Sequence, residues 1–325
     1  MATTIEQTRF GAMRDDYQVA PAGVTVVLPT YREAMNLSTL IPSIYAVLGR
    51  PLQILIVDDD SQDDTDRIIQ YFMDMDYPVS LITRLQERGL ASAIFRGITE
   101  AVFDRVIVMD ADGQHPVSLL PQFVVALETC DLAVGTRRRD GGSVGDWRLT
   151  RRIISGVSNL LAKPLCPQSD RTGGFFGLHR RILDGVTLDA IGWKAGLEIF
   201  CKAHYQSYTE LPFEFGERQH GESKLSSKQM VQYLAHLAKL YAYKFHLAQF
   251  IKFCLVGLSG VGVNLAILTV LVEIGQWDYR LAAAVGIGVA MMSNFVLNKR
   301  WTFRATSSPR RRAVSGRKRK EQEAN

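Results

Sequence analysis

The stretch VIVMDADGQHPVS, residues 106–118, begins as a buried strand and changes character at Asp110. Its first four residues, Val106–Met109, form an apolar run rich in β-branched side chains, which is typical of a strand covered on both faces. Two carboxylates then follow two residues apart, at Asp110 and Asp112. Because neighbouring like charges disfavour each other's ionisation, this strand end indicates that the acids have a function there.

Similar runs alternate with helical patterns from about residue 22 to 225. The runs that predict strands are VTVVLP (24–29), QILIVD (53–58), RVIVMD (105–110) and DLAVGT (131–136). Between them, residues 35–49, 63–73 and 89–103 space their apolar side chains by three and four, as amphipathic helices do. This alternation predicts an α/β domain built on a mostly parallel sheet.

Three of these strands end in polar sequence: LPTYRE, VDDDSQDDT and MDADGQHP. A single acidic strand end could be a helix cap, but ligands bind at the carboxyl ends of parallel strands, so three such ends predict one shared site. Carboxylates alone would repel a phosphate, whereas Mg²⁺ or Mn²⁺ would join the two through oxygen ligands. Asp110-Ala111-Asp112 suits that role, with Gln114 as a neutral oxygen ligand. The chain has no P-loop motif.

Two long apolar stretches follow, residues 253–272 and 281–298, and neither contains a charge. Each is about long enough to cross a hydrocarbon core of roughly 30 Å, although two buried helices of a soluble domain would also fit. Five glycines in them would let the helices approach closely: residues 257, 260, 262, 286 and 288. Basic residues flank the pair at its outer ends (Lys244, Lys252, Lys299 and Arg300), which predicts a hairpin with both ends cytosolic.

The segment between the two parts, residues 226–249, predicts an amphipathic helix. Its apolar side chains (Met230, Leu234, Leu237, Tyr241 and Phe245) share one face, and its basic side chains lie largely elsewhere. Next to a membrane span, such a helix usually lies in the interface, and the alternative is a helix packed on the soluble domain.

The two ends of the chain are polar. Residues 304–325 carry a net charge of +6, compared with +5 for the whole chain, so the rest is nearly neutral. This distribution favours a solvated tail or a contact with anionic lipid over a nucleic-acid partner. Residues 1–21 lack the apolar core of a signal peptide, so the bulk of the protein is expected in the cytosol.

Seven motifs resemble, in order, those of the polyprenyl-phosphate (dolichyl-phosphate) mannose synthases, which are family 2 glycosyltransferases of the GT-A fold. They are VVLPTYREAMNL, IVDDDSQDDT, MDADGQHP, VGTR, RRIIS, SDRTGGFF and GERQHGESKL. The resemblance covers about residues 22–245. It implies a Rossmann-like GT-A domain at 22–225, the interfacial helix at 226–249 and a transmembrane hairpin at 250–303. The hairpin resembles the first half of a GtrA-like domain, which in full has four spans.

The resemblance also implies roles for particular residues. The nucleotide would be held by Pro29, Tyr31, Glu33, Val57 and Asp59. The diphosphate and sugar would follow at Asp110, Ala111 and Asp112, with Asp112 and Gln114 on the metal. Arg218 and Lys224 would close over the donor. Arg137, Arg151 and Ser155 would bind the acceptor phosphate, and the residues expected to carry catalysis are Asp110, Asp112, Arg137 and Arg151.

The expected reaction is a metal-dependent, inverting transfer of mannose from GDP-mannose to dolichyl or polyprenyl phosphate. It would occur at the cytosolic face of the endoplasmic reticulum in a eukaryote, or of the plasma membrane in a prokaryote. We find no persuasive Ser-His-Asp or Cys-His set, and a lipid phosphate, ionised at pH 7, can attack without a strong base. The alternatives are a UDP-glucose-dependent glucosyltransferase and, from another class, a non-catalytic membrane scaffold or lipid carrier. A processive polysaccharide synthase is disfavoured because no Q-x-x-R-W motif follows the acids.

Overall fold

The computed structural model describes residues 8–9, 23–143, 149–189, 191–216 and 227–303. The chain divides into two compact units, Met1–Leu240 and Tyr241–Asn325. The first unit contains the strands and the second contains the two long apolar helices.

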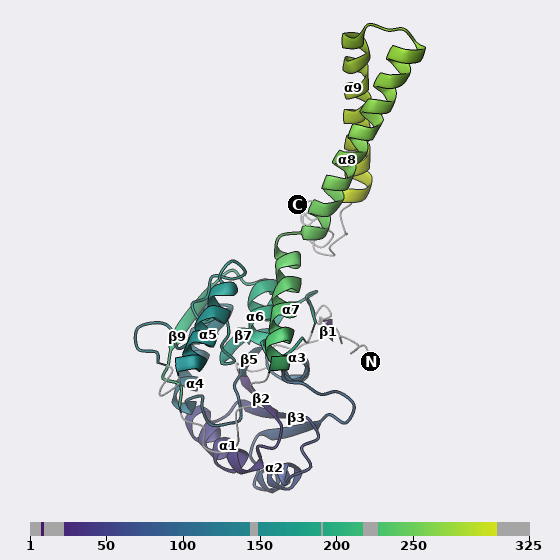
Figure 1. Ribbon diagram of the computed structural model, residues 1–325. Coiled ribbons are helices and arrows are strands. Elements are labelled where there is room, and N and C mark those ends of the chain that lie inside the picture. Colours follow the sequence, from purple (N-terminus) through teal and green to yellow (C-terminus); the bar gives the residue numbers. More distant parts are fainter. Residues whose placement is uncertain (1–7, 10–22, 144–148, 190, 217–226, 304–325) are drawn as a thin grey trace, which may run out of the picture. The chain divides into compact units, whose positions relative to one another are not determined.

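A seven-stranded sheet forms the centre of the first unit (Figure 1), with the strand order β4-β3-β2-β5-β7-β6-β9. All of its pairings are parallel except those of β7, which runs antiparallel to β5 and β6. The strands are β2 (Val24–Thr30), β3 (Leu52–Asp58), β4 (Val79–Thr83), β5 (Arg105–Val108), β6 (Leu132–Thr136), β7 (Phe176–His179) and β9 (Tyr208–Pro212). A separate two-stranded sheet pairs β1 (Thr8–Arg9) with β8 (Thr187–Leu188). The predicted α/β class and mostly parallel sheet are confirmed.

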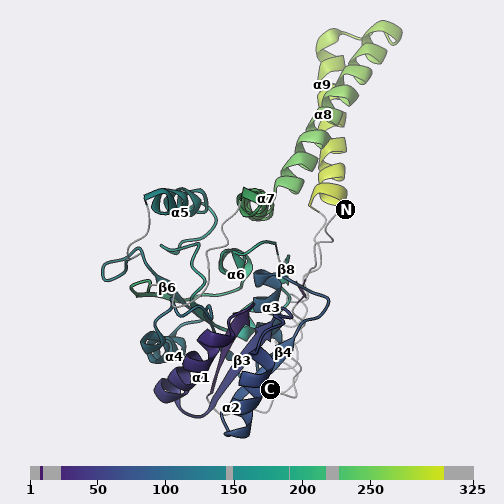
Figure 2. The ribbon, with the colours of Figure 1, turned by 60° about the horizontal axis from the view of Figure 1, so that its bottom comes forward.

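Helices cover both faces of the sheet (Figure 2). One face carries α1 (Ala34–Leu48), α2 (Thr65–Asp74) and α4 (Leu120–Thr129), and the other carries α3 (Leu90–Glu100) and α6 (Ala195–Lys202). Both faces of the sheet are covered because both are apolar, as strand β2 shows. Val26 and Leu28 belong to the hydrophobic core cluster under α1, whereas Val27 faces α3. At that contact, a Cβ on Gly97 would lie 2.3 Å from Val27, so only glycine lets the helix sit this close.

The last helix of the unit, α7 (Ser227–Lys244), packs on the domain through one side. Tyr233, Leu237 and Leu240 are buried, and the Tyr233 hydroxyl donates to the main-chain oxygen of Ser158 at 2.6 Å. Ser158 belongs to α5 (Leu149–Leu161). Leu234, from the apolar face predicted by the spacing, stays exposed, so the helix packs on its own domain and also keeps an apolar exposed side.

The second unit is a helical hairpin. Its helices are α8 (Leu247–Thr269) and α9 (Tyr279–Leu297), each continued by a π-helical turn. The apolar stretches Gln249–Ile274 and Tyr279–Thr302 have mean hydropathies of 2.2 and 1.7 and are long enough to cross a membrane. Only 11% and 17% of their most apolar windows are buried, which disfavours the alternative of two core helices in a soluble domain.

Two of the five glycines lie where the helices of the hairpin meet. A Cβ on Gly260 would lie 2.3 Å from the Asn294 side chain, and one on Gly286 would lie 2.6 Å from Asn264. The other three glycines (257, 262 and 288) face open space, so the prediction that all five serve close packing is wrong for them.

Candidate active site

One cavity of about 740 Å³ opens at the carboxyl ends of the strands of the first unit. Its size is that of a typical small-molecule site. Residues at the end of β2 and after β2, β3 and β5 line it together, as the three polar strand ends predicted: Pro29, Tyr31, Glu33, Asp59, Asp110, Ala111, Asp112 and Gln114. The register explains this meeting, because β2 pairs in parallel with both β3 and β5 and their ends therefore share one edge.

The turn after β5 is fixed by its own side chains. The main-chain N–H of Gln114 donates to Asp112 Oδ1 at 3.1 Å, and Gly113 between them adopts a φ of +76°. The side-chain amide of Gln114 donates to the main-chain oxygen of Gly216 at 3.1 Å. Since the Gln114 nitrogen is used in this way, the amide oxygen is the atom that can serve as an acceptor or a metal ligand.

His115 supports this turn from beneath. Its Nδ1 accepts a hydrogen bond from the Asp110 main-chain N–H at 3.0 Å. Its ring stacks on Phe175 at 4.7 Å and meets the edges of Phe213 and Phe215, both at 5.7 Å. Burial in this aromatic setting lowers the pKa of His115 to about 4, so the ring is neutral at pH 7 and carries its proton on Nε2.

Asp59 is held in place by a residue that the motifs did not indicate. Arg84 Nε donates to Asp59 Oδ1 at 2.8 Å, and the Gly89 main-chain N–H donates to Oδ2 at 2.7 Å. Both charged side chains are buried. A buried carboxylate fixed on both oxygens gives this part of the cavity a rigid polar wall.

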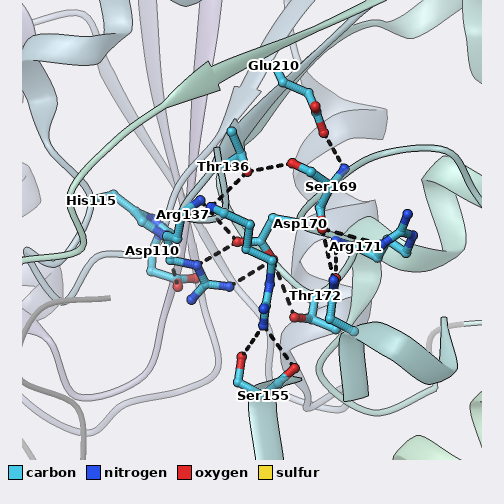
Figure 3. A network of polar contacts seen from close by, with 12 residues as sticks. Asp110, His115, Thr136, Arg137, Ser155, Ser169, Asp170, Arg171, Thr172 and Glu210 are labelled. Carbon is cyan, nitrogen blue, oxygen red and sulfur yellow. Dashed lines mark hydrogen bonds and ion pairs between the residues drawn. The ribbon is translucent and has the colours of Figure 1, made fainter. Parts of the chain in front are cut away.

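Another part of the cavity wall is basic, and at its centre is a buried ion pair between Arg137 and Asp170 (Figure 3). Arg137 Nε and Nη2 donate to the two oxygens of Asp170, at 2.7 and 3.1 Å. Asp170 is fully buried, which raises the pKa of its carboxyl, but Arg137 and Arg138 more than offset this and hold the pKa below its usual value. The pair fixes the orientation of the Arg137 guanidinium group at the cavity wall.

Helix α5 brings Arg151 and Ser155 to the same cavity, on one face as predicted from their spacing. The Ser155 hydroxyl accepts a hydrogen bond from Arg138 at 2.8 Å. Arg137, Arg151 and Ser155 therefore line one cavity, and Arg138 joins them through its hydrogen bond to Ser155. Figure 3 shows Arg137 and Ser155 within one network of polar contacts. Lys194, from the segment before α6, lines the cavity as well and was not foreseen.

Among the expected residues that the structure describes, Val57 alone does not line the cavity. Val57 lies within β3, and its buried side chain packs towards Gly97 of α3, so it does not line the cavity. Arg218 and Lys224 fall in residues 217–226, outside the part of the chain that the structure describes.

The protein side chains at the turn after β5 fit a hard divalent cation that is shared with phosphate. Within the described ranges, no three His, Cys, Asp or Glu side chains come together as a metal cage. Asp112 and the amide oxygen of Gln114 supply oxygen donors at the cavity wall. Mg²⁺ and Mn²⁺ suit such a site, because they are commonly held by one or two carboxylates and substrate phosphates.

Comparisons with known proteins agree with this geometry. The sequence profile of glycosyl transferase family 2 matches residues 25–187, and that of the GtrA/DPMS transmembrane domain matches residues 252–316. A dolichol-phosphate mannosyltransferase of Pyrococcus furiosus is 38% identical over 287 residues, which cover 86% of this chain and 81% of that protein. A dolichol-phosphate mannosyltransferase of Saccharomyces cerevisiae is 35% identical over 234 residues, 68% of this chain and 88% of that protein.

Proposed function

The chain belongs to glycosyl transferase family 2, with a GtrA/DPMS transmembrane domain, and from this premise we propose that it transfers mannose from GDP-mannose to dolichyl or polyprenyl phosphate. That it is a glycosyltransferase and a membrane protein follows from the family and from its relatives. The donor, the metal and the membrane face are the parts that we propose.

One observation carries the proposal: an acidic wall and a basic wall line the same cavity. Asp110 and Asp112 form the first, at the end of β5, and Arg137 and Arg151 form the second. A diphosphate joined to the acids by a cation and a lipid phosphate held by the arginines would meet between the two walls. Guanidinium forks match phosphate oxygens, which favours a phosphate acceptor over a neutral alcohol.

The cavity also has an apolar part. Ile154 of α5 and Met230 and Tyr233 of α7 line it, beside Arg151 and Ser155. An isoprenoid chain whose phosphate lies at Arg151 would find apolar contacts there, and a water-soluble acceptor would not need them. This arrangement supports a lipid phosphate as the acceptor class.

The chemistry is a single displacement. An oxygen of the lipid phosphate attacks the anomeric carbon of mannose, the bond from that carbon to the diphosphate breaks, and GDP leaves with the electron pair. Attack opposite the leaving group inverts the configuration, so an α-linked donor gives a β-linked product. The acceptor oxygen is already ionised at pH 7 and needs no general base. Arg137 and Arg151 orient it, and Asp110 positions the sugar. A bound Mg²⁺ or Mn²⁺ would stabilise the negative charge of the diphosphate.

The names of the relatives favour mannose over glucose, which remains the alternative. The test is to incubate the purified full-length protein with dolichyl phosphate and, separately, GDP-mannose, GDP-glucose, UDP-glucose and UDP-N-acetylglucosamine. We expect a lipid-linked sugar from GDP-mannose alone. Product from UDP-glucose alone would overturn the donor assignment and establish the alternative.

We also propose that the catalytic unit lies on the cytosolic face of the membrane. Nucleotide sugars are charged and soluble, and the basic flanks of the hairpin favour cytosolic ends. We propose the endoplasmic reticulum membrane if the source is eukaryotic and the plasma membrane if it is prokaryotic.

A further inference from the structure

Lys194 lies at the cavity wall immediately before α6. The chain turns into this position at Gly192, whose φ is +69°. The Lys194 ammonium group donates to the main-chain oxygen of Thr172 at 2.5 Å and lies 3.5 Å from the centre of the Trp193 ring. Among the residues that the structure describes, no carboxylate forms an ion pair with it.

The charges around Lys194 leave its ammonium group incompletely balanced. Burial, together with the charges of Arg137 and Arg151, lowers its pKa to about 7, against the opposing effect of Asp170 and Asp110. The carboxylate with the larger effect on this pKa, that of Asp170, is already held by Arg137 through two hydrogen bonds. A partly buried cation in this situation is stabilised when an anion arrives.

We propose that Lys194 binds the acceptor phosphate together with Arg137 and Arg151, an inference that rests on the proposed function. The two cations that lower the pKa of Lys194 are Arg137 and Arg151. An anion bound by these two arginines would therefore also lie close to the Lys194 ammonium group. A phosphate dianion has three oxygens that can accept hydrogen bonds, enough for one ammonium group and two guanidinium forks.

Trp193 is a positioning residue for this lysine. Its ring lies against the ammonium group, a contact that favours the charged form. The indole N–H is buried and has no hydrogen-bond partner within the described ranges, a cost that points to a functional reason for the position of the ring.

Steady-state kinetics of the full-length protein test the proposal. Lys194→Met removes the charge at similar length, and we expect the KM for dolichyl phosphate to rise about tenfold or more, since hydrogen bonds to charged groups are the strong ones. The KM for GDP-mannose should stay within about twofold of the parent. Lys163→Met, the same change at an exposed lysine outside the cavity, should alter neither value.

The pH profile separates a binding role from a structural one. Between pH 7 and 9 the phosphate charge is constant, the two arginines stay charged, and the pKa of Asp170 is already below its usual value. Deprotonation of Lys194 should therefore raise the acceptor KM of the parent protein over this range. Lys194→Arg, whose charge is permanent, should remove that rise. Trp193→Leu should make the rise in acceptor KM begin at a lower pH, because the ring contact that favours the charged lysine is lost. Trp193→Phe keeps an aromatic ring and should return the start of the rise to the pH seen in the parent protein.

Binding of a short-chain polyprenyl phosphate, with the matching alcohol as the control, separates this inference from the proposed function. If the parent protein binds the phosphate but makes no mannolipid, the proposed function is refuted. The inference about Lys194 would still stand in that case, provided that Lys194→Met weakens binding of the phosphate. Unchanged phosphate binding and unchanged acceptor KM in Lys194→Met, or a rise confined to the GDP-mannose KM, would overturn the inference. If Lys194→Met does not fold, Lys194→Arg and the two Trp193 variants decide by their pH profiles.

Discussion

At the scale of single residues, two charged side chains of the cavity are held by partners from distant parts of the sequence. Asp59 is fixed by Arg84, and Arg137 by Asp170. The acids after the strands could be predicted, because a motif at a strand end is local. Their partners could not, since the folded sheet brings them together and neither spacing nor periodicity indicates which arginine reaches which acid.

The metal prediction is tested at Asp112. Asp112→Asn keeps the shape of the side chain and removes its charge, so we expect kcat to fall on the order of a hundredfold or more without loss of folding. EDTA should abolish turnover of the parent protein, and added Mg²⁺ or Mn²⁺ should restore it. Asp66→Asn, at an exposed carboxylate of α2, is the matched control. Turnover that persists in EDTA would contradict the assignment.

The acceptor prediction compares two adjacent arginines of α5. Arg151 lines the cavity, whereas Arg152 is exposed and does not. Arg151→Ala should raise the acceptor KM about tenfold or more and leave GDP-mannose binding nearly unchanged, because it removes a charge-assisted contact to phosphate. Arg152→Ala should behave like the parent. If Arg151→Ala weakens binding of the nucleotide sugar instead, this arginine belongs to the donor side.

At the scale of elements, α7 shows where sequence periodicity is insufficient. Its spacing predicted an apolar face that included Leu234, yet the face that packs on the domain includes His236 and carries Lys239 at its edge. The reason is a cluster of buried charges beneath the helix, since His236 lies 3.3 Å from Glu198 and Lys239 lies 2.8 Å from Asp189. A sequence pattern alone assigns the polar residues of a helix to the solvent-exposed side. Only the folded structure shows that His236 and Lys239 contact buried acids instead.

The charge cluster gives a stability prediction at Glu198. This carboxylate is fully buried, and it accepts from Lys202 at 2.6 Å and from the Asp189 main-chain N–H at 2.7 Å. Glu198→Gln should destabilise the first unit by about 3 kcal/mol, because it removes one of the two buried carboxylates that neutralise Lys202. Glu100→Gln breaks an exposed pair with Arg96 and should cost less than about 0.5 kcal/mol.

Glu198 also makes the stability of the first unit depend on pH. Thermal unfolding of the protein and hydrogen exchange of α7 measure this dependence. Although burial raises it, the pKa of Glu198 is lowered overall by its bonds to His236 and Lys202. A lowered pKa in the folded state means that its stabilisation is present above the ordinary value of 4.5 and is lost as the pH falls below it. Glu198→Gln should flatten this acid limb. An unchanged limb, or equal destabilisation by Glu100→Gln, would contradict the role of the cluster.

At the scale of the whole molecule, the division of the chain was predictable because composition changes sharply along it. Two long stretches without charge predicted the two helices of the hairpin, and the structure confirms both. Which glycines lie at their contact was not predictable from composition. Gly260 and Gly262 are two residues apart on one helix, and only Gly260 meets the opposite helix, because the rotation of each helix about its axis is decided by packing.

The hairpin also predicts how the chain crosses a membrane. Lysines and arginines stand before the first span and after the second, so both ends should face the cytosol and the turn at Gln276 should face the opposite side.

Gln276→Cys tests the turn, since this residue is exposed between the helices, and Lys163→Cys tests the catalytic unit from an exposed site on α5's C-terminal side. In sealed vesicles, a membrane-impermeant maleimide should label only one of the two introduced cysteines from a given side. Lys163→Cys should react from the side on which added GDP-mannose is used, and Gln276→Cys should react there only after the vesicles are opened by detergent. Labelling of both cysteines in intact vesicles from that one side would show that the apolar helices do not cross, and the positive flanks would then require another explanation, such as attraction to anionic lipid at the surface.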